Sequence, residues 1–358
     1  MIESQPHHID GSTVAVIVTY GQRAALLRQT IENVTRCAEL IHIIIVDNGS
    51  LQELDLDKVE FEGAITVVRN QYNLGSAGGF GRGIAAALLI KDAEFLVILD
   101  DDNLVEPNFL TKLVKCYRAL RSGSDVALCA LREDRPQYQL LLENGSAALP
   151  RPNAFLGFHI GDTLRRIVNR KAKKPTGKVE NVRLRAIETG PYGGLFMTVE
   201  AAKVTGIPRA DFILYGDDHE YTQRLGANNI DLYLTDLVKV TDGERSWNMS
   251  GSKESPWLAS QGGGWRQYYA ARNHVYLECA ARPKAAIYQV NRFLFTLRLT
   301  LSCFFINRSF LRTRTLLTPF MKGVRDGIRG ELGYRAQFPI PGAPPSDGLC
   351  IQNVDGLR

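Results

Sequence analysis

One stretch constrains the fold more than any other, because the apolar run from Phe95 to Leu99 leads directly into Asp100, Asp101 and Asp102. An apolar run without polar alternation predicts a strand buried on both faces, as in the parallel sheets of α/β proteins. Open α/β sheets place ligands at the carboxyl ends of their strands. Three carboxylates at that position predict a hard divalent cation, Mg²⁺ or Mn²⁺, as their counter-ion. An acidic turn before a helix is the simpler alternative.

The parts of the chain on either side of this stretch predict further strands, and those before it form a parallel unit that ends at the same edge. Further buried strands are predicted at 14–20, 41–46, 65–69 and 126–131, with a helix at 23–35. Consecutive strands joined by a helix form a right-handed parallel unit. Thr19, Tyr20 and Asp47 are therefore expected to lie near one another. Asp47 at this edge accepts a hydrogen bond from a nucleotide, or it closes a tight turn and does nothing more.

A glycine-rich stretch follows the third predicted strand, from Asn73 through Gly75 to Gly83. Glycine lets a ligand approach the backbone closely, and amides at a helix start favour anions. We expect this stretch to form a loop before a helix at 84–91, with Arg82 as a phosphate contact. A Gly-x-Gly-x-x-Ala match inside the stretch is discounted as a dinucleotide site, because it does not follow the first strand.

A second acidic group, Asp217, Asp218 and Glu220, precedes a predicted helix that runs through Leu225. The helix dipole and N-capping explain one acid at a helix start, but they explain several within a few residues less well. A carboxylate that removes a proton from an attacking hydroxyl is the functional alternative.

Together these motifs resemble family 2 glycosyltransferases with the GT-A fold. The resemblance covers about residues 14–276 and rests on Val18-Thr19-Tyr20, the Val46 to Ser50 segment, Asn73-Leu74-Gly75, the three aspartates and a Tyr-Tyr-x-x-Arg-Asn segment at 268–273. It implies a Rossmann-like, mostly parallel α/β sheet flanked by helices, followed here by a helical appendage. It also implies that the first three motifs hold a nucleotide diphospho-sugar donor and that the acidic motif binds a metal on its diphosphate.

The resemblance further implies roles for individual residues. Asp218 matches the catalytic base, with Asp217 and Glu220 as acceptor-orienting groups. The donor-binding residues it implies are Thr19, Tyr20, Asp47, Asn73, Gly75, Arg82, Asp100 and Asp101. Asp100 and Asp102 would hold Mn²⁺ or Mg²⁺, and Asp242 stands where many relatives place a histidine that completes the metal sphere. Tyr192 and Trp265 are expected to contact the acceptor, although the spacing of Trp265 also fits a helix that faces the core.

The resulting functional prediction is an inverting, metal-dependent glycosyltransferase. The acidic motifs look closest to bacterial galactofuranosyltransferases that use UDP-galactofuranose, with a glycan or lipid-linked glycan acceptor in cell-envelope polysaccharide synthesis. Rhamnosyl transfer from dTDP-rhamnose is the near alternative. A nucleotidyltransferase and a sugar-binding module without catalysis are alternatives of other classes. No nucleic-acid partner is expected, and a homo-oligomer stays open.

Charge is unevenly distributed along the 358 residues. Between residues 282 and 335 the chain has eleven Lys or Arg and two acids, although the formal net charge is only +5. A helical segment that is rich in Leu, Phe and Arg favours either an interfacial anchor on an anionic membrane or a subdomain packed on protein. The six scattered cysteines and the polar N-terminus predict a cytoplasmic protein, with the cytoplasmic face of the inner membrane as a further site.

We divide the chain accordingly. A tail at 1–12 precedes a catalytic domain at 13–280, whose halves at 13–131 and 132–280 hold the nucleotide-sugar and the acceptor. The basic helical segment covers 281–335, and the Pro-rich residues 336–358 are expected to form an extended tail.

Overall fold

The computed structural model describes the chain apart from residues 1–9, 51–53, 55, 57–58, 122, 134, 145–151, 162–182, 245–256, 259–263, 282 and 345–358. Most of the predicted tail at 1–12 and the end of the tail at 336–358 thus lie outside the described residues. Among those described, no helix combines the length and hydropathy that crossing a lipid bilayer requires.

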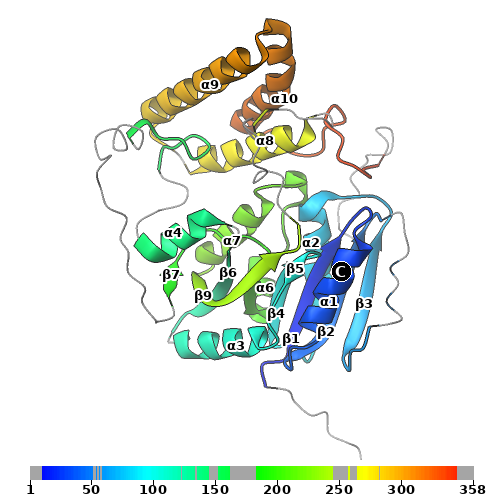
Figure 1. Cartoon of the computed structure of the whole chain (residues 1–358). Helices are drawn as coiled ribbons and strands as arrows, with labels where there is room; N and C mark the ends of the chain where they lie inside the picture. Colours follow the sequence, from blue (N-terminus) through cyan, green and yellow to red (C-terminus); the bar gives the residue numbers. More distant parts are fainter. Residues whose placement is uncertain are drawn as a thin grey trace, which may run out of the picture.

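A mixed sheet with helices on both faces forms the body of the molecule (Figure 1). Its strands run β3-β2-β1-β4-β8-β6-β9-β5, and β7 pairs with β9. The strand bounds are β1 Thr13–Thr19, β2 Leu40–Asn48, β3 Ala64–Asn70, β4 Phe95–Asp100, β5 Asn103–Leu104, β6 Asp125–Arg132, β7 Leu184–Ala186, β8 Leu195–Thr198 and β9 Ile230–Asp242. The first four strands in sheet order are parallel, as expected, whereas β8 pairs antiparallel with both β4 and β6.

Alternate residues of the buried strands face two apolar cores. One core packs α1 (Ala24–Val34) and α3 (Phe109–Leu120) against one side of the sheet. The other core packs α2 (Gly75–Ala87), α4 (Pro136–Asn144), α6 (Val199–Thr205) and α7 (Asp217–Ala227) against the opposite side. Because both faces are covered, β1, β2 and β4 read as continuous apolar runs.

The register of the parallel strands brings their ends together, as the sequence predicted. Thr19 is paired with Asp47, and Val18 is paired with Asp100. The expectation for the glycine-rich stretch was wrong in one respect, because helix α2 begins at Gly75 and contains most of that stretch. The glycines instead permit close packing: a Cβ on Gly83 would lie 2.5 Å from Val16, and one on Gly75 would lie 2.0 Å from the Ile213 carbonyl oxygen.

Three further helices, α8 (Trp265–Ala280), α9 (Ala285–Asn307) and α10 (Phe310–Arg329), form a layer beyond one end of the sheet (Figure 1). Helices α8 and α10 meet backbone to backbone, since a Cβ on Gly323 or Gly327 would lie within 2.4 Å of a carbonyl oxygen of α8. Residues 335–344 leave α10 without regular structure but are not a free tail: Phe338 and Ile340 are buried.

Candidate active site

Two arginines hold the acidic motif at the end of β4. Arg132 donates to Asp100 at 3.2 Å, and Arg23 donates to Asp102 at 3.1 Å. The Asp100 side chain is 37% exposed, the most open of the three aspartates, and that of Asp102 is 13% exposed. Burial, followed by the negative charge of Asp100, raises the pKa of Asp102. The two carboxylates therefore lie close enough to repel each other and present oxygen ligands at an accessible edge.

Asp101 faces the interior and is already fully engaged. It accepts hydrogen bonds from Thr19 Oγ1 at 2.7 Å and from Arg23 Nε at 2.9 Å, and its side chain is 4% exposed. Burial raises the pKa of Asp101 to about 7 despite the Arg23 charge. Thr19 and Asp101 were both predicted to contact the donor. Their hydrogen bond joins the end of β1 to the acidic motif.

The Asp242 side chain is placed beside the acidic motif but is paired with cations. It forms an ion pair with Arg132 and accepts from Asn103 Nδ2 at 3.1 Å. Among the described residues, no three His, Cys, Asp or Glu side chains form a group that could hold a metal by themselves. Asp100 and Asp102 fit a Mg²⁺ or Mn²⁺ site of the kind in which one or two carboxylates bind the ion and substrate phosphates and water complete its sphere.

The segment before β8 fits tightly against the same acids. A Cβ on Gly193 would lie 2.9 Å from Asp100 Oδ2, 2.6 Å from Arg132 Nη1 and 2.5 Å from Asn103 Oδ1. Only a residue without a side chain fits here unless its neighbours shift. The neighbouring Tyr192 is buried, and its hydroxyl has no hydrogen-bond partner among the described atoms. Burial and the charges of Asp217 and Asp218 raise the pKa of Tyr192.

The two acidic groups, distant in sequence, converge at this edge. Asp217 is 3% exposed at the start of α7, where Ser76 of α2 hydrogen-bonds its side chain. Burial and the charge of Asp218 raise the pKa of Asp217 well above its usual range, and Asp100 contributes in the same direction. Its Oδ2 has no partner among the described atoms. Asp217 therefore keeps its proton where an ordinary aspartate is ionised.

Asp218 is more open than Asp217 and lies among other titratable side chains. Its Oδ1 accepts from the His219 amide at 2.9 Å. Its charge raises the pKa values of Tyr138 and Cys129, where burial is the larger cause. The ring centroids of His274 and His219 lie 5.7 Å apart. Burial lowers the pKa of His274 to about 4. His274 is therefore a neutral imidazole at neutral pH, and its Nδ1 is hydrogen-bonded to the Ala270 carbonyl at 2.9 Å.

Glu220 lies one helical turn after Asp217 and pairs with Arg224 of the same helix. It forms an ion pair with Arg224 at 3.1 Å and is 8% exposed. Burial raises the pKa of Glu220, although Arg224 opposes the shift. The ion pair with Arg224 stabilises the start of α7, whereas Glu220 Oε2 is buried and has no hydrogen-bond partner among the described atoms.

A clamp from α8 holds the loop that leads into Asp217. Asn273 Nδ2 donates to the carbonyl oxygens of Phe212, Leu214 and Tyr215, at 2.8 to 2.9 Å. Arg272, which is completely buried, donates to the carbonyl of Phe212 at 2.9 Å. The loop needs this support because Ile213, Tyr215 and Gly216 all have φ between 66° and 77°, a region in which side-chain-bearing residues are uncommon. Arg272 and Asn273, the Arg-Asn pair of the predicted motif, therefore stabilise the loop before α7.

The remaining predicted donor residues are spread along the edge. One carboxylate oxygen of Asp47 accepts from the Ser50 amide at 2.8 Å, which is the turn-closing bond expected as its simpler alternative. Asn73 Oδ1 accepts from Asn48 and from the Gly75 amide. Tyr20 is 41% exposed beside Arg23. Arg82 lies away from the start of α2 and donates to Asn70 Oδ1 at 2.6 Å.

The packing around Trp265 corresponds to the core-facing alternative. Its side chain is 8% exposed in a cluster with Tyr268, Tyr269 and Phe338. Its ring stacks on Tyr215 with 6.3 Å between centroids, and Arg266 lies over it at 4.2 Å. A sugar that stacks on Trp265 would have to displace one of these contacts.

Several residues that shape this site were missed by the sequence analysis: Arg23, Ser76, Gly193, Arg132 and His274. Arg23 and Arg132 stand at a helix start and at a strand end, positions where a counter-ion for the three aspartates could have been sought. No local signal marks Gly193, since its constraint arises only from packing between elements.

The comparisons with known proteins come from sequence and structure. Residues 14–154 match the family model described as "Glycosyl transferase family 2". The matched segment is less than half of the chain; it contains β1 to β6 and the three aspartates, whereas Asp217 and Asp218 lie beyond it. The match supports a glycosyltransferase. The search of curated proteins found no match.

Solved structures with a similar fold include two nucleotide-sugar complexes. One is S. aureus TarS 1-349 with UDP-GlcNAc, at 13% identity and a TM-score of 0.46, covering 89% of this chain and 83% of that one. Another is the mannosyltransferase PcManGT from Pyrobaculum calidifontis with GDP-Man and Mn²⁺, at 14% identity and a TM-score of 0.47, covering 89% and 88%. These likenesses are distant, and no function is taken from them.

Proposed function

We propose that this protein transfers a hexosyl group, with inversion, from a nucleotide diphospho-sugar to an acceptor hydroxyl in a metal-dependent reaction. The convergence of Asp100 and Asp102 with Asp217 and Asp218 at one edge of the sheet carries this proposal. Inverting transfer needs one base on the acceptor side and compensation for the charge of a leaving diphosphate on the donor side, and the two acidic groups offer both.

The donor half would bind the nucleotide across the ends of β1, β2 and β4. Asp100 and Asp102 would hold Mn²⁺ or Mg²⁺, which when bound neutralises charge on the leaving diphosphate. Arg23 and Arg132 already pair with these carboxylates and would fix their orientation. The family match covers this half of the site, which is the main support for a sugar-nucleotide donor.

The acceptor half would divide two tasks between adjacent carboxyl groups. Asp217 keeps its proton because it is buried beside the charge of Asp218, so it would donate a hydrogen bond through its unpartnered oxygen. Asp218 would take the proton from the attacking hydroxyl. Placing two neighbouring carboxyl groups in different surroundings is a common solution for acid and base roles at one pH.

For the substrates, we propose UDP-galactofuranose as donor and a glycan or lipid-linked glycan as acceptor, with dTDP-rhamnose as the alternative donor. This assignment rests on the resemblance of the Asp-Asp-Asp and Asp217-Asp218 motifs alone. A panel of sugar nucleotides, read by release of nucleoside diphosphate, would identify the donor. Release of pyrophosphate instead would indicate a nucleotidyltransferase.

The base assignment is tested with Asp218→Asn, which keeps the shape of the side chain and removes the base. We expect turnover to fall by at least about 100-fold, with nucleotide binding unchanged. Asp231→Asn, at an exposed carboxylate that accepts from Ser124, is the matched control and should retain full turnover. Unchanged turnover of the Asp218 variant would refute the assignment.

A further inference from the structure

We propose that α9 and the start of α10 form a docking face for an anionic phospholipid bilayer. This inference goes beyond the proposed transfer reaction and does not depend on it. It rests on the exposure, spacing and charge of the side chains of these two helices.

Helix α9 is apolar on two opposite sides. Tyr288, Leu299 and Cys303 are buried against α8, α10 and Phe155. The opposite side carries a row of exposed residues spaced three or four apart, which we call the apolar ridge: Val290, Phe293, Leu297, Leu301 and Phe304. A soluble surface helix normally has one apolar stripe, and a helix that is apolar all round is normally covered by something else.

The turn between α9 and α10 adds the most exposed apolar side chains of this region. Phe305, Phe310 and Leu311 are 71%, 77% and 73% exposed, and Ile306 is 51% exposed. These four residues, the apolar tip, follow directly on the ridge. Scattered single apolar residues are normal on protein surfaces, whereas a contiguous row of this extent marks a binding surface.

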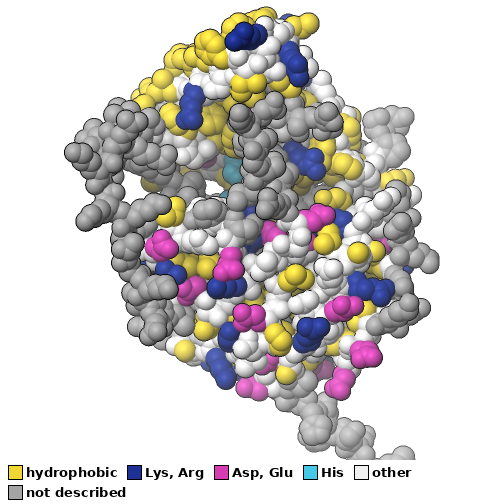
Figure 2. Space-filling view, viewed as in Figure 1, with side chains coloured by type: hydrophobic (Ala, Val, Ile, Leu, Met, Phe, Trp, Pro, Cys, Tyr) yellow, Lys and Arg dark blue, Asp and Glu magenta, His cyan; other side chains and the backbone are white. Residues whose placement is uncertain are grey.

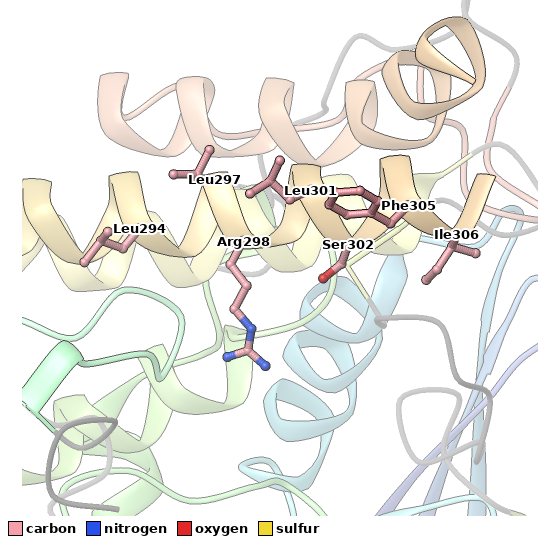
Figure 3. Close-up of a pocket in the computed structure, with 7 residues that line it drawn as sticks. All are labelled: Leu294, Leu297, Arg298, Leu301, Ser302, Phe305 and Ile306. Atoms are coloured by element: carbon pink, nitrogen blue, oxygen red, sulfur yellow. The ribbon is translucent and has the colours of Figure 1, made fainter. Parts of the chain in front are cut away.

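A shallow groove of about 580 Å³ runs along the same helix. Its seven lining residues all belong to α9: Leu294, Leu297, Arg298, Leu301, Ser302, Phe305 and Ile306. Figure 3 shows Arg298 extending from the helix with its guanidinium directed away from Leu297 and Leu301. Arginine in such a row can keep its charge at a polar boundary while its neighbours enter an apolar one.

The charge of the segment favours an anionic partner. Residues 283–325 contain eight Lys or Arg and no Asp or Glu. Arg308, Arg312 and Arg314 are exposed and flank the apolar tip. Figure 2 shows apolar and basic side chains over the helical layer at the top, whereas the acidic side chains in that view lie on the sheet domain below.

A bilayer fits this combination better than a second copy of the chain. Two copies meeting ridge to ridge would bring together two basic surfaces that carry no acids of their own, and like charges in contact oppose association. An anionic leaflet attracts each exposed Arg or Lys and receives apolar side chains between its headgroups. One bilayer surface would therefore pair with the basic side chains and bury the apolar side chains of this face.

The test is flotation of the full chain with vesicles of phosphatidylcholine alone and of phosphatidylcholine mixed with phosphatidylglycerol. We expect binding to the mixed vesicles only, weakened by salt. Two triple variants should each weaken it by about tenfold or more. They are Phe305→Ser, Phe310→Ser, Leu311→Ser at the tip and Arg308→Glu, Arg312→Glu, Arg314→Glu beside it. Both sets are exposed, so the fold should be retained, which thermal unfolding checks.

Leu89→Ser and Lys91→Glu are the matched controls, because Leu89 is 70% exposed and Lys91 is exposed on the sheet domain, away from α9. Both should bind mixed vesicles like the unmodified chain. The proposal is overturned if the unmodified chain ignores anionic vesicles, if both triple variants bind normally, or if the ridge instead mediates a dimer that never binds vesicles. Each readout is independent of glycosyl transfer.

Discussion

At the scale of single residues, the arginines explain how three adjacent aspartates coexist. Arg23 bridges Asp101 and Asp102, and Arg132 bridges Asp100 and Asp242. Arg23 also pairs with Glu244, so each cation serves two or more acids, and each of the three aspartates keeps a fixed orientation. Paired charges of this kind are weak evidence for stability but strong constraints on geometry. Ion pairs thus hold the acidic side chains at this edge of the sheet in place.

Gly193→Ala tests this geometry by steric displacement. The new Cβ would lie within 3.0 Å of Asn103, Arg132 and Asp100, so these side chains must shift. We expect nucleotide affinity in the presence of Mn²⁺ to weaken by about tenfold, equivalent to about 1.4 kcal/mol. Titration calorimetry with UDP measures it. Gly226→Ala in α7 is the control, because a Cβ there meets nothing within 4 Å. Equal affinities for the two variants would contradict the steric argument.

At the scale of elements, the clamp between α8 and the loop at 211–216 is the clearest case of one segment ordering another. One amide group donates to three carbonyls, and a buried guanidinium donates to the same loop. These bonds hold a loop in which Ile213, Tyr215 and Gly216 have positive φ, immediately before the acids of α7. Strain of this kind persists only when the surroundings over-determine it.

Asn273→Asp removes the donors and keeps the shape of the side chain. A carboxylate facing three carbonyl oxygens would push the loop away, so we expect turnover to fall by about tenfold or more with a smaller effect on nucleotide affinity. Steady-state kinetics separates these effects. Asn228→Asp, which removes a single amide bond to the Arg224 carbonyl at the other end of α7, should leave turnover within about twofold of normal. A similar loss in both variants would argue against the clamp.

Glu278 of α8 provides a test by pH. It accepts from the Leu156 amide at 2.7 Å and from the Tyr288 hydroxyl at 3.0 Å, and burial raises its pKa to about 7. The folded chain therefore holds this proton between about pH 4.5 and 7, where the unfolded chain has released it. The free energy of unfolding should fall with rising pH in that window by up to about 3 kcal/mol relative to Glu278→Gln. Urea unfolding of both proteins at several pH values measures this difference. Parallel stability profiles of the unmodified chain and Glu278→Gln would contradict the raised pKa of Glu278.

The sequence predicted individual elements better than their mutual packing. Continuous apolar runs located β1, β2, β4 and β6 to within two residues, because burial on both faces leaves an unambiguous signal. The glycine-rich stretch was misjudged, since glycine is locally a poor helix former and only contact with β1 and with the 213 carbonyl explains its use in α2. Asp242 and Trp265 were assigned from motif position, whereas their partners, Arg132 and Tyr215, come from other parts of the chain.

At the scale of the whole molecule, residues 335–344 join the helical layer to the sheet. Phe338 stacks on Tyr268 with 4.3 Å between ring centroids. Farther along, the Pro341 and Gly342 carbonyls accept from Asn73 Nδ2 and from the Asn73 amide, both at 2.8 Å. The segment predicted as an extended tail therefore contacts the edge where the donor nucleotide is proposed to bind.

Phe338→Ala should weaken this connection. Loss of a buried aromatic ring is expected to lower the free energy of unfolding by about 3 kcal/mol, and release of the segment should also lower nucleotide affinity. Chemical unfolding and UDP titration measure the two effects. Phe310→Ala is the control, because that ring is 77% exposed and its removal should change stability by less than about 0.5 kcal/mol. Unchanged nucleotide affinity in the Phe338 variant would confine the segment to a structural role.

The hydrogen bonds to Asn73 have a consequence for biosynthesis. The side-chain amide of Asn73 donates to a carbonyl 268 positions later in the chain. A ribosome that has already produced β1 to β4 must therefore continue to residue 342 before both of these hydrogen bonds can form. A nascent polypeptide halted ahead of residue 341 would have its acids in place but would lack both carbonyls, so this corner of the sheet is completed later in synthesis than the strands that form it.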